Sequence, residues 1–209
     1  MNKMVLLGWL FPGIDEINGK GIPLWENPEK PWSILSQNEN GIENQLSRLT
    51  DSKDGVIIHP SAKIGDNVRI EGQCYIGANA EIRHSAYLRK GSWICEGAVV
   101  GHSSEIKNSV LLPNSKAPHF NYVGDSIVGV GVNLGAGVKL SNVRNDKGDV
   151  IVRMRDGEKI NSGLTKLGAL IGDYSQIGCN VVTNPGAILA PSSMVSPNET
   201  VTGWFETKS

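Results

Sequence analysis

Large aliphatic residues recur at every sixth position after residue 55. The series comprises Ile58, Ile64, Ile70, Ile76, Ile82, Leu88, Ile94, Val100, Ile106 and Leu112. A small or slim residue stands four positions after most of these, as at Ala62 and Ala80. An amphipathic helix has a period of 3.6 residues and a strand has a period of two, so neither keeps this register. The period of six predicts a parallel β-helix built from hexapeptide repeats.

In such a fold each aliphatic side chain points into a narrow prism, and the small residue fills the inside of a corner. Three sides make one coil of about eighteen residues, and successive coils lie roughly 4.8 Å apart. A residue therefore lies above the one eighteen positions earlier. We expect an all-β domain over residues 56–209 with about five coils, whose open ends need caps.

Residues 1–55 lie outside the repeat and are expected to form an N-terminal arm or cap. A helix is predicted within residues 33–49, with Ile42, Leu46 and Leu49 on one face. The expected role of this segment is to cover the open first coil. For residues 1–30 a flexible linker is the alternative, and the sequence leaves it open.

The repeat is interrupted twice, and loop insertions are expected near residues 113–127 and 143–166. The first break contains Pro113 and Pro118, and the register resumes in a new phase at Val128. In the second, two β-prone segments flank Asp156 and Gly157, which is a strong hairpin signal. Insertions in repeat proteins form exposed loops that often carry the binding face. We therefore expect the chemistry at these two breaks.

Composition narrows the choice of partners and compartment. The 209 residues carry 20 Lys and Arg against 21 Asp and Glu, so neither nucleic acid nor a membrane surface is expected as a partner. Three cysteines, an odd number, favour a reducing compartment and predict a cytoplasmic protein. The apolar start of the chain is too short to span a bilayer.

Two motifs resemble the acetyltransferase half of a bifunctional family, the N-acetylglucosamine-1-phosphate uridylyltransferase/glucosamine-1-phosphate acetyltransferases. One is the run His119-x-x-Tyr122-x-Gly-Asp125, and the other is Asn133-x-Gly-Ala136-Gly. The similarity extends over roughly residues 56–195 and is nearest to archaeal-type sugar-phosphate nucleotidyltransferases with a similar C-terminal module. The glycine-rich phosphate loop of the nucleotidyltransferase half has no counterpart in this sequence.

This resemblance implies a left-handed β-helix and an acetyl-CoA-dependent N-acetyltransferase acting on glucosamine 1-phosphate or a similar amino-sugar phosphate. Such a reaction belongs to nucleotide-sugar biosynthesis for a cell envelope. His119 matches the catalytic base of the family, and an imidazole with a pKa of about 6.5 suits proton transfer near neutral pH. The residues that match its substrate-binding set are Arg89, Lys107, Tyr122, Asn133 and Lys166. Arg89 and Lys107 match the phosphate-binding pair, and their spacing of eighteen predicts neighbouring positions on adjacent coils.

The same resemblance implies acetyl-CoA as co-substrate, bound in a groove between two β-helices of a homotrimer. Ala136, Cys179 and Pro197 would line that groove, and backbone N–H groups there would polarise the thioester carbonyl. The amine would attack the thioester directly, so no covalent enzyme intermediate is needed. A role for Cys179 as an acyl-carrying nucleophile stays open as an alternative.

Two other functions remain open from the sequence alone. One is a non-catalytic module that trimerises or regulates a separately encoded nucleotidyltransferase. The other is a zinc enzyme of the γ-carbonic-anhydrase type, because His84 and His102 are eighteen apart and stacked imidazoles suit zinc. His119, the remaining candidate ligand, is expected one residue out of register with them, so the principal hypothesis has no metal. The sequence does not distinguish glucosamine from galactosamine, nor does it fix the acyl chain.

Overall fold

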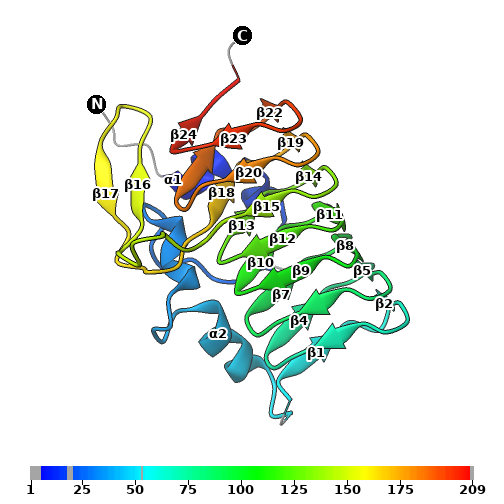
Figure 1. Ribbon diagram of the computed structural model, residues 1–209. Helices are drawn as coiled ribbons and strands as arrows, with labels where there is room; N and C mark the ends of the chain where they lie inside the picture. The colour runs from blue at the N-terminus through cyan, green and yellow to red at the C-terminus, as the bar shows by residue number, and fades with distance from the viewer. Residues whose placement is uncertain (1–5, 18–20, 53, 208–209) are drawn as a thin grey trace.

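A computed structural model describes residues 6–17, 21–52 and 54–207, and it shows three parallel sheets that wind into one solenoid (Figure 1). Wall A consists of β1 (Val56–Ile58), β4 (Cys74–Ile76), β7 (Ser92–Ile94), β10 (Ser109–Leu111), β13 (Ile127–Val128), β18 (Ala169–Ile171), β21 (Ala187–Leu189) and β24 (Trp204–Phe205). Wall B consists of β2 (Lys63–Ile64), β5 (Glu81–Ile82), β8 (Val99–His102), β11 (Lys116–His119), β14 (Asn133–Leu134), β19 (Gln176–Ile177) and β22 (Met194–Val195). Wall C consists of β3 (Arg69–Ile70), β6 (Tyr87–Leu88), β9 (Glu105–Lys107), β12 (Tyr122–Gly124), β15 (Lys139–Leu140), β20 (Val182–Thr183) and β23 (Thr200–Val201).

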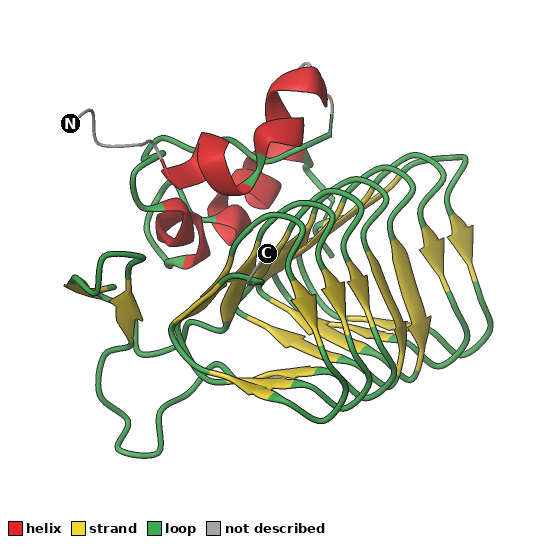
Figure 2. Ribbon diagram, turned by 90° about the horizontal axis from the view of Figure 1, so that it is seen from above, coloured by secondary structure: helices red, strands yellow, loops and turns green. Residues whose placement is uncertain are grey.

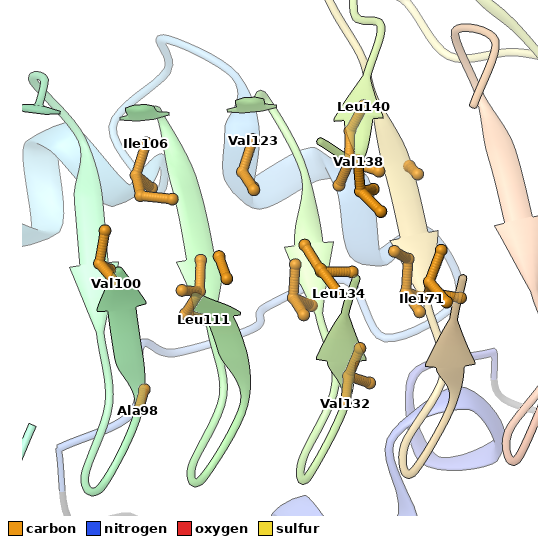
Figure 3. Packing of buried hydrophobic residues seen from close by; sticks show 14 of the residues in the cluster. Ala98, Val100, Ile106, Leu111, Val123, Val132, Leu134, Val138, Leu140 and Ile171 are labelled. Atoms are coloured by element: carbon orange, nitrogen blue, oxygen red, sulfur yellow. The ribbon is translucent and has the colours of Figure 1, made fainter. Parts of the chain in front are cut away.

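The predicted β-helix is confirmed, and its inward aliphatic residues form one continuous core. Ile76, Ile82 and Leu88 have no exposed surface. Figure 3 shows the same stacking in later coils, where Leu111, Leu134 and Ile171 point into the prism. Wall A has eight strands, so the solenoid makes about eight turns rather than the expected five.

One residue is missing from the repeat at the corner between β9 and β10. Asn108, with φ of 43°, alone connects β9 to β10, and the spacing between stacked residues falls from 18 to 17. As a result Leu111, not Leu112, stacks on Ile94 and points inward. Leu112 instead packs in a second cluster outside the prism.

The insertion expected near residues 113–127 is wrong. This stretch forms β11, β12 and β13, which continue the three walls without interruption. The change of phase read from the sequence came from two successive coils that are each one residue short, at the corners of Asn108 and Asp125, and not from an added loop.

Residues 143–166 leave the walls between β15 and β18, and we call this segment the excursion. It carries the antiparallel hairpin of β16 (Ile151–Arg153) and β17 (Lys159–Asn161), which the Asp-Gly pair predicted. An antiparallel bridge between Val143 and Lys166 closes its base. Across it Leu140 stacks directly on Thr183, so the walls resume in register.

The N-terminal segment contains α1 (Leu6–Leu10), η1 (Pro12–Ile17), η2 (Pro31–Leu35) and α2 (Ile42–Leu49). The helix predicted within 33–49 is shorter than expected: η2 ends at Leu35, and α2 begins only at Ile42, with Gly41 as its N-cap. Of its expected apolar face, Ile42 and Leu46 are fully buried and Leu49 is 57% exposed.

This segment covers the outer face of wall A and not the open end of the first coil (Figure 2). Trp32 and Leu10 belong there to one buried cluster with Trp93 and Ile127. Because Leu6, Leu10 and Phe11 are buried, the linker alternative does not hold for residues 6–11. Ile58 and Ile64 of the first coil remain 44% and 41% exposed. The expected end cap is therefore wrong. The outer face of wall A is itself apolar, so the N-terminal segment packs on this face and not on the end of the first coil.

A buried carboxylate fixes the start of the segment to the solenoid. Asp173 is fully buried and accepts hydrogen bonds from the backbone N–H groups of Gly13, at 2.8 Å, and Val130, at 2.7 Å. Its own N–H donates to the Leu10 carbonyl at 2.9 Å.

Candidate active site

The predicted base and the predicted cofactor-lining residues lie in a single column along the corner between walls B and C. In order of the coils the column comprises His84, His102, His119, Ala136, Cys179 and Pro197. Backbone hydrogen bonds join its neighbours: Gly137 N–H donates to the His119 carbonyl at 3.0 Å, and Asn180 N–H donates to the Ala136 carbonyl at 2.8 Å. His119 therefore lies one coil below Ala136.

His119 ends β11 on the solvent-exposed face of this corner. Its backbone N–H donates to Oδ1 of Asn121 at 2.9 Å, and Asn121 Nδ2 donates to the Gly135 carbonyl at 2.8 Å. The His119 imidazole makes no hydrogen bond or ion pair to any other residue that the structure describes. Asn121 is buried and holds the corner from inside. No such role was assigned to Asn121 from the sequence. The available signal was its polar side chain at a corner position that the repeat usually gives to a small residue.

Arg89 and Lys107 lie next to each other on the outer face of wall C. Leu88 pairs with Ile106, and Arg89 N–H donates to the Ile106 carbonyl at 2.8 Å, so Arg89, directly after β6, lies beside Lys107 at the end of β9. Each cation already has a carboxylate partner. Arg89 Nη1 lies 2.9 Å from Glu105 Oε1, and Lys107 Nζ lies 2.8 Å from Asp125 Oδ2. The hydrogen bond to Glu105 raises the pKa of Arg89 further above its ordinary value.

Asp125 is the most deeply buried charge near these residues. Only 4% of its side chain is exposed, and it accepts hydrogen bonds from Lys107 Nζ, Asn108 Nδ2 and Asn142 Nδ2. Three donors compensate the cost of burying the carboxylate. The sequence reasoning quoted Asp125 within a motif but assigned it no role.

Tyr122 lies on the same wall, and its ring runs along its own strand. A Cβ atom on Gly124 would come within 2.6 Å of the Tyr122 hydroxyl, so this glycine makes room for the ring. Burial raises the pKa of Tyr122, and the nearby carboxylates of Asp125 and Glu105 raise it further. The phenol therefore stays protonated and can donate a hydrogen bond.

Lys166 returns from the excursion to the same region. Lys107, Asp125 and Lys166 line one pocket of about 280 Å³. Asn133 is not part of this group, because it lies on wall B between Lys116 and Gln176. One chain thus gathers Arg89, Lys107, Tyr122 and Lys166 around wall C and leaves Asn133 on wall B.

Two histidines of the column, His84 and His102, stack on each other. The rings of His84 and His102 lie 4.1 Å apart and are nearly parallel. His119 pairs with His102 in register, and the expected one-residue offset is wrong because that coil has lost a residue. Even so, no three His, Cys, Asp or Glu residues in the described part of the chain are grouped to hold a metal ion.

Comparison with known proteins places the chain in a family. Residues 70–203 match the family model described as the GMPPB C-terminal domain. The chain belongs to this family. The bifunctional sugar-1-phosphate nucleotidylyltransferase/acetyltransferase of Sulfurisphaera tokodaii is 37% identical over 195 residues, which cover 85% of this chain and 46% of that protein. The bifunctional protein GlmU of Methanococcus aeolicus is 34% identical and is matched over 88% of this chain and 47% of its own length.

The chain spans about half the length of these two relatives. The uncharacterized acetyltransferase YaiX of Escherichia coli O6:K15:H31 is 34% identical over 93% of this chain and 90% of its own length. The resemblance read from the two motifs is thereby confirmed. Across residues 6–17, 21–52 and 54–207, no helix has the length and apolar character needed to cross a membrane.

Proposed function

We propose that this protein is an acetyl-CoA-dependent N-acetyltransferase that acts on glucosamine 1-phosphate or a similar amino-sugar phosphate. One observation carries the proposal: His119 lies directly below Ala136 in the column that continues through Cys179 and Pro197. Direct acyl transfer to an amine requires a base within reach of the amine beside the bound thioester. The names of two relatives, a bifunctional nucleotidylyltransferase/acetyltransferase and an uncharacterized acetyltransferase, support the same class of reaction.

In this mechanism Arg89 and Lys107 hold the phosphate, and Tyr122 donates to the sugar. His119 takes a proton from the amine as its nitrogen attacks the thioester carbonyl. An amide bond forms, the carbon–sulfur bond breaks, and the protonated His119 passes its proton to the sulfur, so that coenzyme A leaves as the thiol. Backbone N–H groups near Ala136 stabilise the oxyanion of the tetrahedral intermediate.

A homotrimer would unite residues that one chain keeps on different walls. Asn133 faces outward from wall B, whereas Arg89, Lys107 and Tyr122 face outward from wall C. A neighbouring copy packed along the corner column would bring a second wall to the site and enclose acetyl-CoA between the two. We place the reaction in the cytoplasm, where acetyl-CoA is available and free cysteines such as Cys74, Cys95 and Cys179 persist.

Thiol release from acetyl-CoA in the presence of glucosamine 1-phosphate tests the proposal. The variant His119→Ala should lower kcat by about 10²–10⁴-fold, the range expected for loss of a general base. His84→Ala is the matched control, because it removes an exposed imidazole from the same column two coils away and should retain activity. An unchanged rate in His119→Ala would remove the base assignment. Absence of thiol release by the unaltered protein with amino-sugar phosphates would overturn the enzymatic proposal and favour a non-catalytic module.

A further inference from the structure

The pocket that contains Lys107 and Lys166 has a third side that does not come from the repeat. Residues of the N-terminal segment, among them Gln37 and Glu43, line it opposite the coils and the excursion. The two lysines and Asp125 line it as well, together with Ser36, Asn108 and Thr165. Three stretches distant in sequence thus meet around one small cavity.

Asn108 fixes the N-terminal side of this pocket. Its amide group donates to the Leu35 carbonyl at 2.9 Å and to Asp125 Oδ1 at 2.8 Å. The same residue forms the shortened turn between β9 and β10. The deletion in the repeat therefore places an amide that joins the N-terminal segment to the floor of the pocket.

Glu43 is held over the adjacent coil. Its carboxylate lies 2.7 Å from Lys90 Nζ, and only 17% of its side chain is exposed. A Cβ atom on Gly91 would lie 3.2 Å from Glu43 Cγ, and this glycine has a φ of 78°. The bare backbone at Gly91 lets α2 approach closely, so the position of Glu43 is built into the fold.

The excursion is anchored equally firmly where it returns. Gly168 N–H donates to the Asp125 carbonyl at 2.8 Å, and Leu167 N–H donates to the Asn142 carbonyl at 2.9 Å. A side chain at Gly168 would come within 2.1 Å of Ser126 Oγ. These contacts fix the backbone directly after Lys166.

The chemistry of the pocket is divided between its sides. Lys107 and Lys166 suit the oxygens of a phosphate, whereas the Glu43 carboxylate accepts hydrogen bonds from hydroxyl groups and the Gln37 amide both donates and accepts them. The volume of about 280 Å³ is at the small end of ligand pockets, which hold about 300–1,000 Å³ for larger ligands. A single sugar ring with one phosphate fits this size and polarity.

We propose that Gln37 and Glu43 hydrogen-bond hydroxyl groups of the amino-sugar phosphate, so that the N-terminal segment sets which sugar epimer the enzyme accepts. The inference rests on the proposed function and deepens it. The pocket lies at the corner between walls C and A, whereas the column of His119 follows the corner between walls B and C. In the proposed homotrimer the column of a neighbouring copy would therefore face this pocket.

The test compares kcat/KM for glucosamine 1-phosphate and galactosamine 1-phosphate, which differ in the orientation of one hydroxyl. In Gln37→Ala and in Glu43→Gln the ratio of the two kcat/KM values should move toward one by about tenfold or more. The reason is that a site built to hydrogen-bond a substrate hydroxyl loses its discrimination when the residue that binds this hydroxyl is replaced. The KM for acetyl-CoA should not change. Lys90→Met is the matched control, since it breaks the ion pair to Glu43 but does not line the pocket.

The inference would be overturned if both pocket variants kept the kcat/KM ratio and the acceptor KM of the unaltered protein. It would also be overturned if Lys90→Met changed the ratio as much as Glu43→Gln. Calorimetric titration with glucosamine 1-phosphate separates this inference from the proposed function. Binding that weakens in Gln37→Ala and Glu43→Gln, in a protein that releases no thiol, would retain the pocket and reject the reaction. Absence of binding to the unaltered protein would reject the pocket itself.

Discussion

Lys107 and Asp125 form an ion pair of 2.8 Å in which the carboxylate is almost completely buried. The carboxylate also receives hydrogen bonds from Asn108 and Asn142. Asn108 in turn contacts the N-terminal segment, and Asn142 directly precedes the excursion. Through these two amides, the Asp125 side chain connects the solenoid to the N-terminal segment and to the excursion.

Replacing Asp125 by alanine should lower the free energy of unfolding by about 3–5 kcal/mol, because it leaves a largely buried ammonium group without a partner. Urea-induced unfolding measures this. Glu105→Gln is the control, since the Arg89–Glu105 pair is more than one-third exposed on both sides and should contribute less than about 1 kcal/mol. Equal losses in the two variants would contradict the central role of Asp125.

Asp173→Ala should detach the N-terminal segment from wall A. The variant removes the acceptor for the Gly13 and Val130 N–H groups, and hydrogen bonds to a buried charge each contribute about 1.5–3 kcal/mol. We expect a loss of about 3 kcal/mol or more, a red shift of tryptophan fluorescence as Trp32 becomes hydrated, and faster proteolysis before residue 55. Asp146→Ala, at an exposed ion pair, should change none of these; an identical response would show that Asp173 has no special role.

Thr183→Val should stabilise the protein by about 1 kcal/mol. Thr183 is fully buried between Leu140 and Val201, and its hydroxyl has no hydrogen-bond partner among the described residues. Valine keeps the shape and removes an unsatisfied polar atom. Thermal unfolding measures the gain. The same substitution at Thr200, on the outer face of the neighbouring strand, should leave the melting temperature unchanged.

Cysteine reactivity should divide sharply between one exposed and two buried thiols. Burial raises the pKa of Cys74 to about 11 and that of Cys95 still further, whereas Cys179 is exposed. A disulfide reagent at pH 8 should therefore label one thiol per native chain and three after unfolding. Cys179→Ser should abolish native labelling and keep kcat within about tenfold, whereas complete loss of acetyl transfer would revive its role as a nucleophile.

Stability should fall in alkaline solution in a defined window. The pKa of Cys74 is raised from 9.0 to about 11, so above pH 9 the unfolded chain releases this proton before the folded chain does. The contribution of the neutral thiol is complete below pH 9 and is lost between about pH 9 and 11, at a cost of up to about 3 kcal/mol. Unfolding measured across this range should show a shallower slope in Cys74→Ala. Cys179→Ser should retain the original slope.

The hexad pattern predicted the walls, but not the exact register beyond residue 108. Val110, Leu111 and Leu112 are all aliphatic, so the sequence fits the prism with either of the last two pointing inward. Leu111 is buried inside the prism, and Leu112 is buried in the cluster that includes the N-terminal segment. That second cluster, which the repeat does not reveal, is what lets Leu112 point out of the prism. The pattern lacked a polar residue that would have marked the shift.

The spacing of Arg89 and Lys107 was sufficient to predict their adjacency, because stacked coils bring such residues together. Their partners Glu105 and Asp125 could not be predicted in the same way, since ion pairing depends on the direction of each side chain. The position of Gln37 and Glu43 was also beyond the sequence. It depends on how Trp32 and Leu46 dock on wall A, and those residues follow no repeat.

Leu140 stacks on Thr183 as though residues 143–166 were absent. The length of that loop is consequently uncoupled from the alignment of the coils above and below it. Val150 and Val152 of the loop are fully buried against the outer face of wall A, so the base of the hairpin is part of the packed structure. The exposed Asp156-Gly157 tip is the place where residues can be added without changing the register of the coils.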